Sequence, residues 1–563
     1  MKRLILLVCL LVPSARAQQP SATTITLGLF TSRVIHRLTV TPLGTNAWQQ
    51  ICATCQHTAL HAPLRLEHIN HSIYLGGSFR IQFDEDVSPI EAAGLYTVTP
   101  TGDGLRVILE LSSERYVAAV LSAEAAPNEP TASLEALAIA ARTFALANLH
   151  RHKADDFDLC DSTHCQTLHL GPLRPAIAQV VRDTAGISLW SGSRRASIYY
   201  TQHCGGITEA ASALWPAEHG PYLTSHADSY CLRHSPAAWQ ANVALTDLIQ
   251  IASEQHWNLP TPITGVRITQ HTASGRAKLL AISSPTQTAT ISASSLHFGI
   301  NRKLGWNRIR SDLYTVVIAN DTLHFNGHGY GHGVGLCQTG AFQMAVEHHT
   351  AAEILAFYFP GTRLGLTPSG SLWHEETVGP VTIRTITADP ELTQDVQRAW
   401  QRALALLPQA GETPQLTITL APTTELFRQL AASPGYLLAV TRGNQITLQP
   451  VPVLKHNGPI EPLLLHELLH TLIESQSTDK APLWLREGLA EALADIHSAY
   501  APPTSSLATI EQRLANPLNL AADQQAHRDA AAIVRTLGHT YSLTVMRQWL
   551  RDGVPTQVQQ TLH

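Results

Sequence analysis

The sequence has no surplus of positive charge. Its 38 lysines and arginines are outnumbered by 43 aspartates and glutamates, which gives a formal net charge of −5. Proteins that grip nucleic acid through its phosphates normally present a basic face, and polybasic membrane anchors need clustered cations. The composition therefore argues against a nucleic-acid partner and against an anchor of that kind.

Long apolar runs are also missing after the N-terminus. No later stretch reaches about 18 uninterrupted apolar residues, the minimum for a transmembrane helix, so we expect the mature protein to be soluble. At the N-terminus itself, two basic residues precede the short apolar run 4–12. Ala-Arg-Ala at 15–17 then supplies small residues at the two positions that a signal peptidase recognises. This pattern predicts a secretory signal peptide over residues 1–17. We therefore expect export to the periplasm, the cell wall or the extracellular space.

Charged residues are scarce, at 14%, whereas hydrophobic residues reach 44%. This balance is typical of a globular chain and not of a disordered one. A length of 563 residues exceeds what one core normally holds, so several domains are expected.

Cysteine is infrequent, and seven of the eight cysteines follow the expected signal peptide. Because seven is odd, at least one thiol must be free, bound to a metal or paired with another chain. Cys52 and Cys55 are separated by two residues and have no second such pair nearby. We expect them to form a disulfide.

The pattern of apolar residues divides the chain into segments. Short β-branched runs broken by Gly, Asp and Pro predict a small sheet over residues 23–111. Helical spacing then predicts helices at 115–124 and 133–150, followed by a loop-rich stretch at 157–235 and, much later, a helix at 341–359.

The polar segment 367–380, which contains Gly, Pro and Ser, predicts a linker. After it, the strand-like runs VTIRTIT and QLTITLAP alternate with helical stretches, and helices dominate from residue 462 onward. We therefore predict an α+β multidomain protein, with a mixed α/β domain at 24–366 and a mostly helical domain at 381–563.

Several blocks, in the same order, resemble the stage II sporulation protein D (SpoIID)/LytB family, the latter also called the amidase enhancer family. The blocks are YVAAVLSAEAAP from residue 116, YYTQHCGGITE at 199–209, PYLTSHADSYC at 221–231 and GHGYGHGVGLCQTGA at 327–341. The resemblance covers roughly residues 24–362. It implies a cell-wall protein whose partner is the glycan strand of peptidoglycan.

The resemblance also implies a catalytic residue. The sporulation members are lytic transglycosylases that act on glycan strands stripped of stem peptides, and their catalytic Glu ends the first helix, which here is Glu124. Such a Glu protonates the glycosidic oxygen and then takes the proton of the sugar's own 6-hydroxyl as a 1,6-anhydro ring closes. Apolar neighbours would raise its pKa. This sequence has Ser-Ala-Glu-Ala-Ala at 122–126 in place of the family's Pro-x-Glu-Met-Pro. Without the resemblance, the interpretation of Glu124 is a solvated residue at the end of a helix.

Two further residues are implied as substrate-binding, Arg142 and His332. The repeated Gly-His-Gly block that holds His332 lines the glycan groove in relatives; His328, in its first half, stands where relatives usually have Arg or Gly-Trp. The alternative is a Gly-rich turn with incidental histidines. A second alternative concerns the whole domain: a non-catalytic, glycan-binding enhancer of a separate cell-wall amidase.

Two thiols and two imidazoles are clustered in the block that follows the second helix. These are ligands that a tetrahedral structural zinc site favours, and some relatives hold zinc in this region. The residues are His152, Cys160, His164 and Cys165, with His150 as an alternative to His152. The competing interpretation is a disulfide of Cys160, with Cys165 or by exchange with Cys204 or Cys231.

The segment LLLHELLHTLIES follows Pro462 and predicts a metal site on a helix. His466 and His470 are four residues apart, so both imidazoles point from one helical face at a single ion. Glu467, between them, is placed to polarise a water molecule on that metal. The alternative is a chance occurrence on a buried helix.

Downstream, APLWLREGLAEALAD begins a second helix with Glu487 seventeen residues after His470. The arrangement resembles the gluzincins, and the Trp-Leu-x-Glu-Gly-x-Ala-Glu pattern is similar to peptidase MA-like families. This resemblance implies Glu487 as the third ligand, zinc as the cofactor and a peptide as the substrate. His527 stands where these relatives often have Tyr. The alternative is an inactive or structural metal domain, as in a scaffold protein.

Overall fold

The computed structural model describes residues 24–44, 47–52, 55–83, 89–408, 414–494, 502–515 and 520–562. The chain divides into two units, Ile25–Leu372 and Trp373–His563, called here the N-terminal and C-terminal units. The expected signal peptide lies outside the described residues. The division falls inside the segment 367–380, but that segment is not all linker, because His374–Val378 forms strand β21 and pairs with its neighbour β22.

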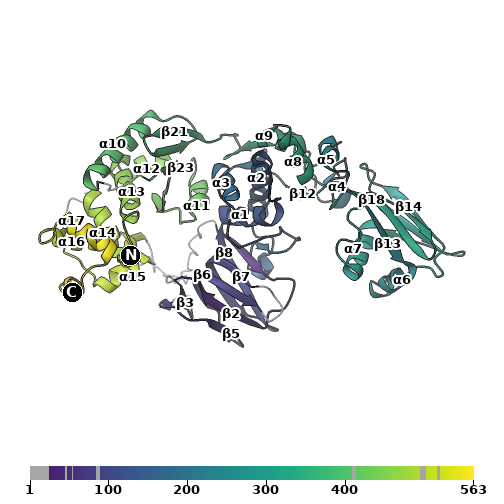
Figure 1. The fold of residues 1–563 in the computed structure, drawn as a ribbon, viewed down its shortest axis with the longest axis horizontal. Helices are drawn as coiled ribbons and strands as arrows, with labels where there is room; N and C mark the ends of the chain where they lie inside the picture. The colour runs from purple at the N-terminus through teal and green to yellow at the C-terminus, as the bar shows by residue number, and fades with distance from the viewer. Residues whose placement is uncertain are drawn as a thin grey trace, which may run out of the picture. The chain divides into compact units, whose positions relative to one another are not determined.

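The N-terminal unit begins with a sheet built, among the described residues, from nine strands. Seven of them run in the order β4-β3-β6-β7-β8-β1-β9, and β2 pairs with both β5 and β6. Strands β3, β6, β7 and β8 of this sheet are labelled in Figure 1. The strands are β1 (Thr24–Leu29), β2 (Arg37–Pro42), β3 (Trp48–Gln50), β4 (Thr58–Ala59), β5 (Leu64–Glu67), β6 (Ile73–Phe83), β7 (Ile90–Pro100), β8 (Leu105–Ser112) and β9 (Leu159–Cys160). Strands β1 to β8 confirm the sheet expected over residues 23–111, and β9 joins it from far along the chain, in parallel with β1.

A group of helices follows this sheet, centred on α2 (Thr131–Ala147), which contacts four of the others. These are α1 (Ser113–Glu124), α3 (Pro175–Asp183), α8 (Gln338–Val346) and α9 (Ala351–Tyr358). Helices α1 and α2 confirm two sequence predictions. The single helix expected at 341–359 is wrong: the chain breaks at His348, which has a φ of 69°, and Thr350 starts α9 with a capping box to Glu353.

Shorter elements complete the body of this unit. Helices α4 (Ala211–Leu214) and α5 (Ser229–His234) flank a loop, and β12 (Tyr200–Thr201) pairs with β19 (Leu336–Cys337). A second small sheet joins β10 (Ser188–Ser191), β11 (Arg194–Arg195) and β20 (Arg363–Gly365).

Residues 238–328 have a hydrophobic core of their own. Two three-stranded sheets, ordered β13-β18-β17 and β14-β15-β16, pack with two helices in this insert. Its elements are β13 (Ala238–Ala244), α6 (Leu245–Glu254), β14 (Gly265–His271), β15 (Ala277–Ser283), β16 (Thr288–Ser292), α7 (Ala293–Leu304), β17 (Tyr314–Ala319) and β18 (Thr322–His328).

The C-terminal unit combines a five-stranded sheet with many helices, which confirms the α+β class and the helical end of the chain. The strand order is β21-β22-β23-β25-β24, with the three central strands parallel. The strands after β21 are β22 (Val381–Thr385), β23 (Leu416–Leu420), β24 (Ala439–Arg442) and β25 (Gln445–Leu448). The helices are α10 (Pro390–Leu406), α11 (Thr424–Ala431), α12 (Val451–Asn457), α13 (Ile460–Glu474), α14 (Leu483–Ala494), α15 (Leu507–Ala515), α16 (Leu520–Gly538), α17 (Leu543–Asp552) and α18 (Thr556–Gln560).

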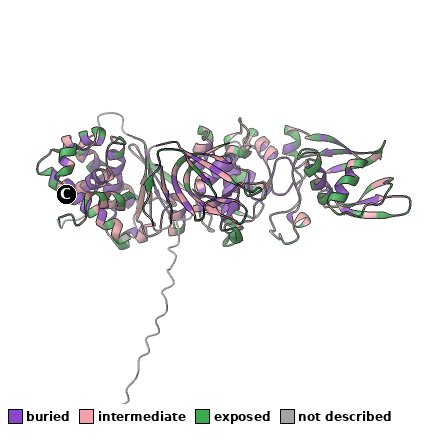
Figure 2. Ribbon diagram, turned by 90° about the horizontal axis from the view of Figure 1, so that it is seen from below, coloured by how far each residue is buried: buried purple, intermediate pink, exposed green. Residues whose placement is uncertain are grey.

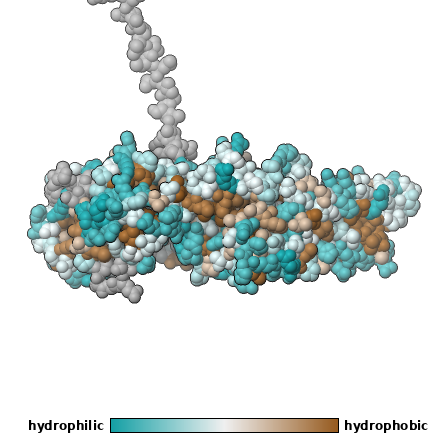
Figure 3. All heavy atoms as spheres, turned by 90° about the horizontal axis from the view of Figure 1, so that it is seen from above, coloured by the Kyte–Doolittle hydropathy of each residue, from teal (hydrophilic) through white to brown (hydrophobic). Residues whose placement is uncertain are grey.

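Burial follows these elements. Figure 2 shows buried residues gathered where helices and strands pack, with exposed residues on the outer faces. The face drawn in Figure 3 is largely hydrophilic or neutral and carries scattered hydrophobic patches. None of the helices in the described part of the chain is long and apolar enough to cross a bilayer.

Candidate functional site

A large groove, of about 1740 Å³, runs through the N-terminal unit. The end of α1, strand β12, the Gly-rich turn before β19 and the first residues of α8 contribute to its lining, together with parts of the insert. Glu124, the last residue of α1, lies in this groove. A groove of this size can hold several sugar rings or a similarly extended ligand.

Glu124 is partly buried, and this burial raises the pKa of its carboxyl. Hydrogen bonds from Gln338 and Thr167 oppose that shift because they favour the charged form. The Gln338 bond runs from Nε2 to Glu124 Oε2 and measures 3.3 Å. The carboxyl is therefore oriented by the protein and has an elevated pKa, as a general acid requires.

An arginine from a distant segment holds the two residues that follow Glu124. Arg174 donates hydrogen bonds to the carbonyl oxygens of Ala126, at 2.9 Å, and Ala125, at 3.1 Å. These bonds fix the chain as it leaves α1. This role of Arg174 could not be predicted from local patterns, because Arg174 lies almost fifty residues away from the loop it holds.

His332 also lines the groove. Its ring lies edge-on to Trp215, with centroids 5.3 Å apart, and its Nδ1 accepts a hydrogen bond from the Val334 amide at 2.9 Å. Burial, aided by the positive charge of Arg276, lowers the pKa of His332 to about 4. The ring is therefore neutral at neutral pH, with its proton on Nε2.

Two other candidates from the sequence lie away from the groove. Arg142 is fully buried in α2, where its guanidinium bonds both carboxylate oxygens of Glu114, at 2.9 and 2.5 Å, and the Ile187 carbonyl. The expectation that Arg142 binds substrate is therefore wrong, because its donors are committed to internal partners. His328 ends β18 with an exposed side chain and is not among the groove residues.

The groove has an aromatic wall that sequence reasoning missed. Trp306 is 65% exposed and Phe298 is 48% exposed, and both line the groove from the insert. An exposed aromatic side chain in a groove is available to stack on a ligand. Sequence alone could not separate these two residues from core aromatics, because their exposure depends on how the insert folds.

The expected group of two cysteines and two histidines does come together. One ligand atom from each of His152, Cys160, His164 and Cys165 lies within 4.8 Å of the others. His152 Nε2 is 3.3 Å from Cys165 Sγ, and His164 Nδ1 is 3.8 Å from Cys160 Sγ. Both cysteines are free thiols. The donor set and its convergence fit a tetrahedral zinc ion.

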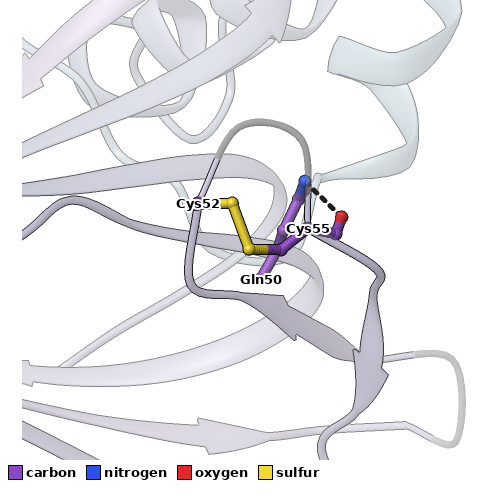
Figure 4. Close-up of a disulfide and its surroundings, with 3 residues drawn as sticks. All are labelled: Gln50, Cys52 and Cys55. Carbon is purple, nitrogen blue, oxygen red and sulfur yellow. Dashed lines mark hydrogen bonds between the residues drawn. A yellow bond between two sulfur atoms is a disulfide. The ribbon is translucent and has the colours of Figure 1, made fainter.

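The alternatives weighed for this cluster do not form. Cys160 is not bonded to Cys165, and Cys204 and Cys231 belong to a separate group of residues. His150 has a 77% exposed side chain whose Nδ1 lies 2.9 Å from Asp158 Oδ1, so it does not replace His152. The Cys52–Cys55 disulfide, in contrast, is present as expected, beside a hydrogen bond from Gln50 to the Cys55 carbonyl (Figure 4).

In the C-terminal unit, α13 and α14 bring the HELLH motif and Glu487 together. Nε2 of His466 and Nε2 of His470 are 2.9 Å apart, and Glu487 Oε2 lies 3.0 Å from His470 Nε2. In a tetrahedral zinc site two imidazole nitrogens lie about 3.3 Å apart. The three side chains therefore converge with a spacing within a few tenths of an ångström of that arrangement.

The charges around this cluster also suit a cation. Burial disfavours a charged His470, but the negative charge of Glu487 outweighs it and raises the pKa of His470 to about 9. The same ion pair overcomes burial of Glu487 and lowers its pKa to about 2. An environment that stabilises a proton here also stabilises a metal ion in its place. The residues present therefore fit a divalent metal.

Several neighbours complete this cluster. Glu491, one turn after Glu487, places Oε2 3.2 Å from Nδ1 of His466 and orients that ring, and sequence reasoning did not assign it. Its position four residues after Glu487 was the available signal. Glu467 is buried, which raises its pKa, and accepts a 2.5 Å hydrogen bond from Thr441. His527 Nδ1 lies 3.5 Å from Glu487 Oε2, so it borders the cluster from α16.

Comparison with known proteins identifies similar chains. Residues 101–190, within the N-terminal unit, match the family model described as Stage II sporulation protein. An uncharacterized protein of Brachyspira hyodysenteriae is 28% identical over 289 residues, which cover 50% of this chain and 74% of that protein. The amidase enhancer of Bacillus subtilis is 25% identical over 285 residues, 42% of this chain and only 39% of the enhancer.

Stage II sporulation protein D of Bacillus subtilis is 27% identical over 268 residues, which cover 45% of this chain and 74% of that protein. The family model and one of these relatives are named for stage II sporulation, and the residues that the family model matches include Glu124 and the cysteine–histidine cluster. The chain is therefore similar to the stage II sporulation protein D family over a segment of its N-terminal unit.

Proposed function

We propose that this chain is an exported cell-wall protein whose N-terminal unit cleaves peptidoglycan glycan strands as a lytic transglycosylase. The observation that carries the proposal is Glu124, a partly buried carboxyl of raised pKa at the end of α1 in a groove of about 1740 Å³. The relatives named for stage II sporulation and for amidase enhancement support a role at the cell wall.

The reaction needs one carboxyl group. Protonated Glu124 donates its proton to the glycosidic oxygen while the bond from that oxygen to C1 breaks. The sugar's 6-hydroxyl then attacks C1, and its proton passes to the Glu124 carboxylate as the 1,6-anhydro ring closes. The acid is thus regenerated, and water is not consumed. The hydrogen bond from Gln338 holds the carboxyl in place throughout.

Other groove residues bind and orient the glycan. The neutral ring of His332 presents a polar edge beside Trp215, and Trp306 with Phe298 offers apolar faces for sugar rings. Such a combination of aromatic faces with a few polar groups is typical of small-molecule and sugar-sized sites.

The test is digestion of peptide-free glycan strands by the full chain, with mass spectrometry of the products. We expect 1,6-anhydro ends from the wild-type protein and a loss of about 100-fold or more for Glu124→Gln, the scale of general acid catalysis. Glu129→Gln is the matched control, because Glu129 lines the same groove but is held by Ser133 and the Ala126 amide. Cleavage that persists in Glu124→Gln would remove Glu124 as the acid.

The second candidate for this unit is a glycan-binding enhancer of a cell-wall amidase, which the 25% identical amidase enhancer favours. It uses the same groove without bond cleavage. Wild-type protein that binds the strands, leaves them intact and accelerates an added amidase would select this function over the first.

For the C-terminal unit we propose a zinc metallopeptidase. His466, His470 and Glu487 would hold the ion, and zinc in such a site supplies a Lewis acid for the scissile carbonyl. Glu467, whose pKa is raised by burial, would accept and then release the proton of the attacking water, while Thr441 fixes its carboxylate. His152, Cys160, His164 and Cys165 would hold a second, structural zinc.

The peptidase proposal is tested with a peptide library and the zinc-loaded full chain. Glu467→Gln should retain zinc and lose hydrolysis, whereas His470→Ala should lose both. A chain that binds zinc at this cluster and cuts no peptide under any loading condition would leave a metal-stabilised domain as the function of the C-terminal unit.

A further inference from the structure

Three cysteines that are far apart in the sequence meet inside the N-terminal unit. Cys204 follows β12, Cys231 lies in α5 and Cys337 ends β19, and all three are fully buried free thiols. Asp228, also fully buried, precedes α5 and completes the group. One ligand atom from each residue lies within 4.8 Å of the other three. This group, called here the three-cysteine cluster, is separate from the groove and from the two metal clusters described above.

The spacing of the ligand atoms is that of a metal site and not of a disulfide. Cys204 Sγ lies 3.4 Å from Cys231 Sγ and 3.2 Å from Asp228 Oδ2. Thiolates around tetrahedral zinc lie about 3.7 Å apart, because each Zn–S bond is about 2.3 Å. The two sulfurs need to move apart by only a few tenths of an ångström to reach that spacing, whereas a disulfide needs them to approach by more than 1 Å. The amide of Cys204 also donates to Cys337 Sγ at 3.2 Å, a contact that favours a thiolate there.

The carboxylate is held so that one oxygen faces the thiols. Its Oδ1 accepts hydrogen bonds from the amides of Tyr230, at 3.0 Å, and Cys231, at 3.2 Å. Its Oδ2 accepts a 2.8 Å bond from the Tyr358 hydroxyl while it points toward Cys204. Outer partners of this kind fix the direction of metal-ligating carboxylates.

A buried positive charge stands beside the cluster. Arg276 is 1% exposed, and its Nη2 donates to the Cys204 carbonyl at 2.5 Å. Three thiolates and a carboxylate around a divalent ion leave an excess of negative charge, which is costly in a buried place unless a cation is near. Arg276 supplies that cation, and it also faces the buried carboxylate of Glu209, to which Ser274 links it.

We propose that Cys204, Asp228, Cys231 and Cys337 form a structural site for a thiolate-preferring divalent metal, zinc above others. The site fastens the loop after β12, the start of α5 and the start of α8 to one another. Because Gln338 follows Cys337 directly and bonds Glu124, the metal also fixes one wall of the groove. The proposal does not depend on whether Glu124 cleaves glycan.

The test uses the full chain loaded with zinc, or with cobalt(II) as a spectroscopic probe. We expect the metal content to fall by one equivalent per chain in Cys204→Ser/Cys231→Ser. The tetrahedral thiolate bands of the cobalt form should weaken in Cys337→Ser. Cys52→Ser/Cys55→Ser is the control and should keep its full metal content, because that pair is a disulfide. Unchanged metal content in a folded Cys204→Ser/Cys231→Ser chain would overturn the proposal.

A second measurement needs no variant and so holds even if the serine variants do not fold. Wild-type chain is treated with an alkylating reagent, without reductant, either folded with zinc or unfolded with a chelator. We expect all three cysteines to be protected in the first sample and alkylated in the second, as read by peptide mass spectrometry. A Cys204–Cys231 disulfide peptide in the zinc-loaded chain would contradict the metal site.

Discussion

Gln338 donates a hydrogen bond to Glu124 from Nε2 to Oε2, at 3.3 Å, and thereby joins the first residue of α8 to the last residue of α1. The two residues are 214 positions apart in the sequence. The bond favours the charged carboxylate, whereas burial favours the neutral acid and prevails, so that the pKa of Glu124 is raised. Protonation of the proposed acid is therefore favoured by burial, and the contact between these two helices opposes it.

Removal of this contact should shift the pH profile in a defined direction. In Gln338→Leu the carboxylate loses a stabilising partner, so the pKa of Glu124 should rise further. Glu124 must be protonated to act, and activity falls as pH rises through its pKa; the alkaline limb of kcat/KM against pH should therefore move to higher pH. The same raised pKa makes the contribution of Glu124 to stability greatest at low pH and lost as pH rises through the folded-state pKa.

The control for this profile is Gln343→Leu, because Gln343 lies in the same helix and donates in the same way to a different acid, Glu347, at 2.9 Å. Gln343→Leu should keep the alkaline limb of kcat/KM at the wild-type pH. A limb that moves to lower pH in Gln338→Leu, or does not move while cleavage is retained, would show that another group controls the alkaline side.

Arg142 should matter for stability and not for substrate binding. Its guanidinium is fully buried and paired with Glu114, whose side chain is 19% exposed. Removal of one partner of such a pair leaves a poorly solvated charge and costs about 3–5 kcal/mol. In Arg142→Met, amide hydrogen exchange in α2 should accelerate, while KM for glycan in the folded fraction stays unchanged. Exchange should slow again in Arg142→Met/Glu114→Leu, which removes the stranded charge; a raised KM with unchanged exchange would restore the substrate-binding interpretation.

The sequence predicted what local patterns determine. Helices α1 and α2 and the HELLH motif on α13 follow from apolar spacing within one element. The break between α8 and α9 was also readable, since Thr350 and Glu353 form the Thr-x-x-Glu signature of a capping box. Arg142 was misassigned because a buried arginine and a substrate-binding arginine look alike in a sequence.

Contacts between distant segments were beyond the reach of the sequence. The three-cysteine cluster joins residues separated by 27 and 133 positions, which only the folded chain brings together. The bond from Gln338 to Glu124 and the exposure of Trp306 depend on the same tertiary packing. Nothing in the spacing of these residues along the sequence indicates that tertiary packing.

Glu491 should strengthen metal binding at the C-terminal cluster by orienting His466. Unlike Glu487, it is not itself a proposed ligand of the ion. Its carboxylate lies 3.2 Å from Nδ1 of His466 and so orients the ring whose Nε2 faces His470. Loss of such a partner costs about 10- to 100-fold in metal affinity. Glu491→Gln should weaken zinc binding by that amount in competition with a chromophoric chelator.

Two comparisons make this measurement specific. Glu487→Gln should weaken zinc binding more than Glu491→Gln does, because it removes a proposed ligand. Glu461→Gln removes an equal charge from α13, where Glu461 pairs with Arg398 and Arg402, and should leave the affinity unchanged. Equal losses in all three variants would indicate a general effect of charge and not an oriented ligand.

Trp306 should contribute to glycan binding through its ring and not through its backbone contacts. The side chain is 65% exposed in the groove, so it packs little of the core, and the Trp306 carbonyl already accepts a bond from Asn301 that substitution leaves intact. Trp306→Ala removes one stacking face and should raise KM about 10-fold, which corresponds to about 1.4 kcal/mol. Its kcat should stay nearly unchanged, because the face binds substrate and transition state alike.

Trp306→Phe should recover most of the affinity that Trp306→Ala loses. Ile249→Ala, which removes an exposed apolar side chain of α6 outside the groove, should have no effect. If Trp306→Ala instead lowered kcat at constant KM, the ring would act on the position of the reacting sugar, and the glycan would have to lie closer to the insert than a simple stacking wall requires.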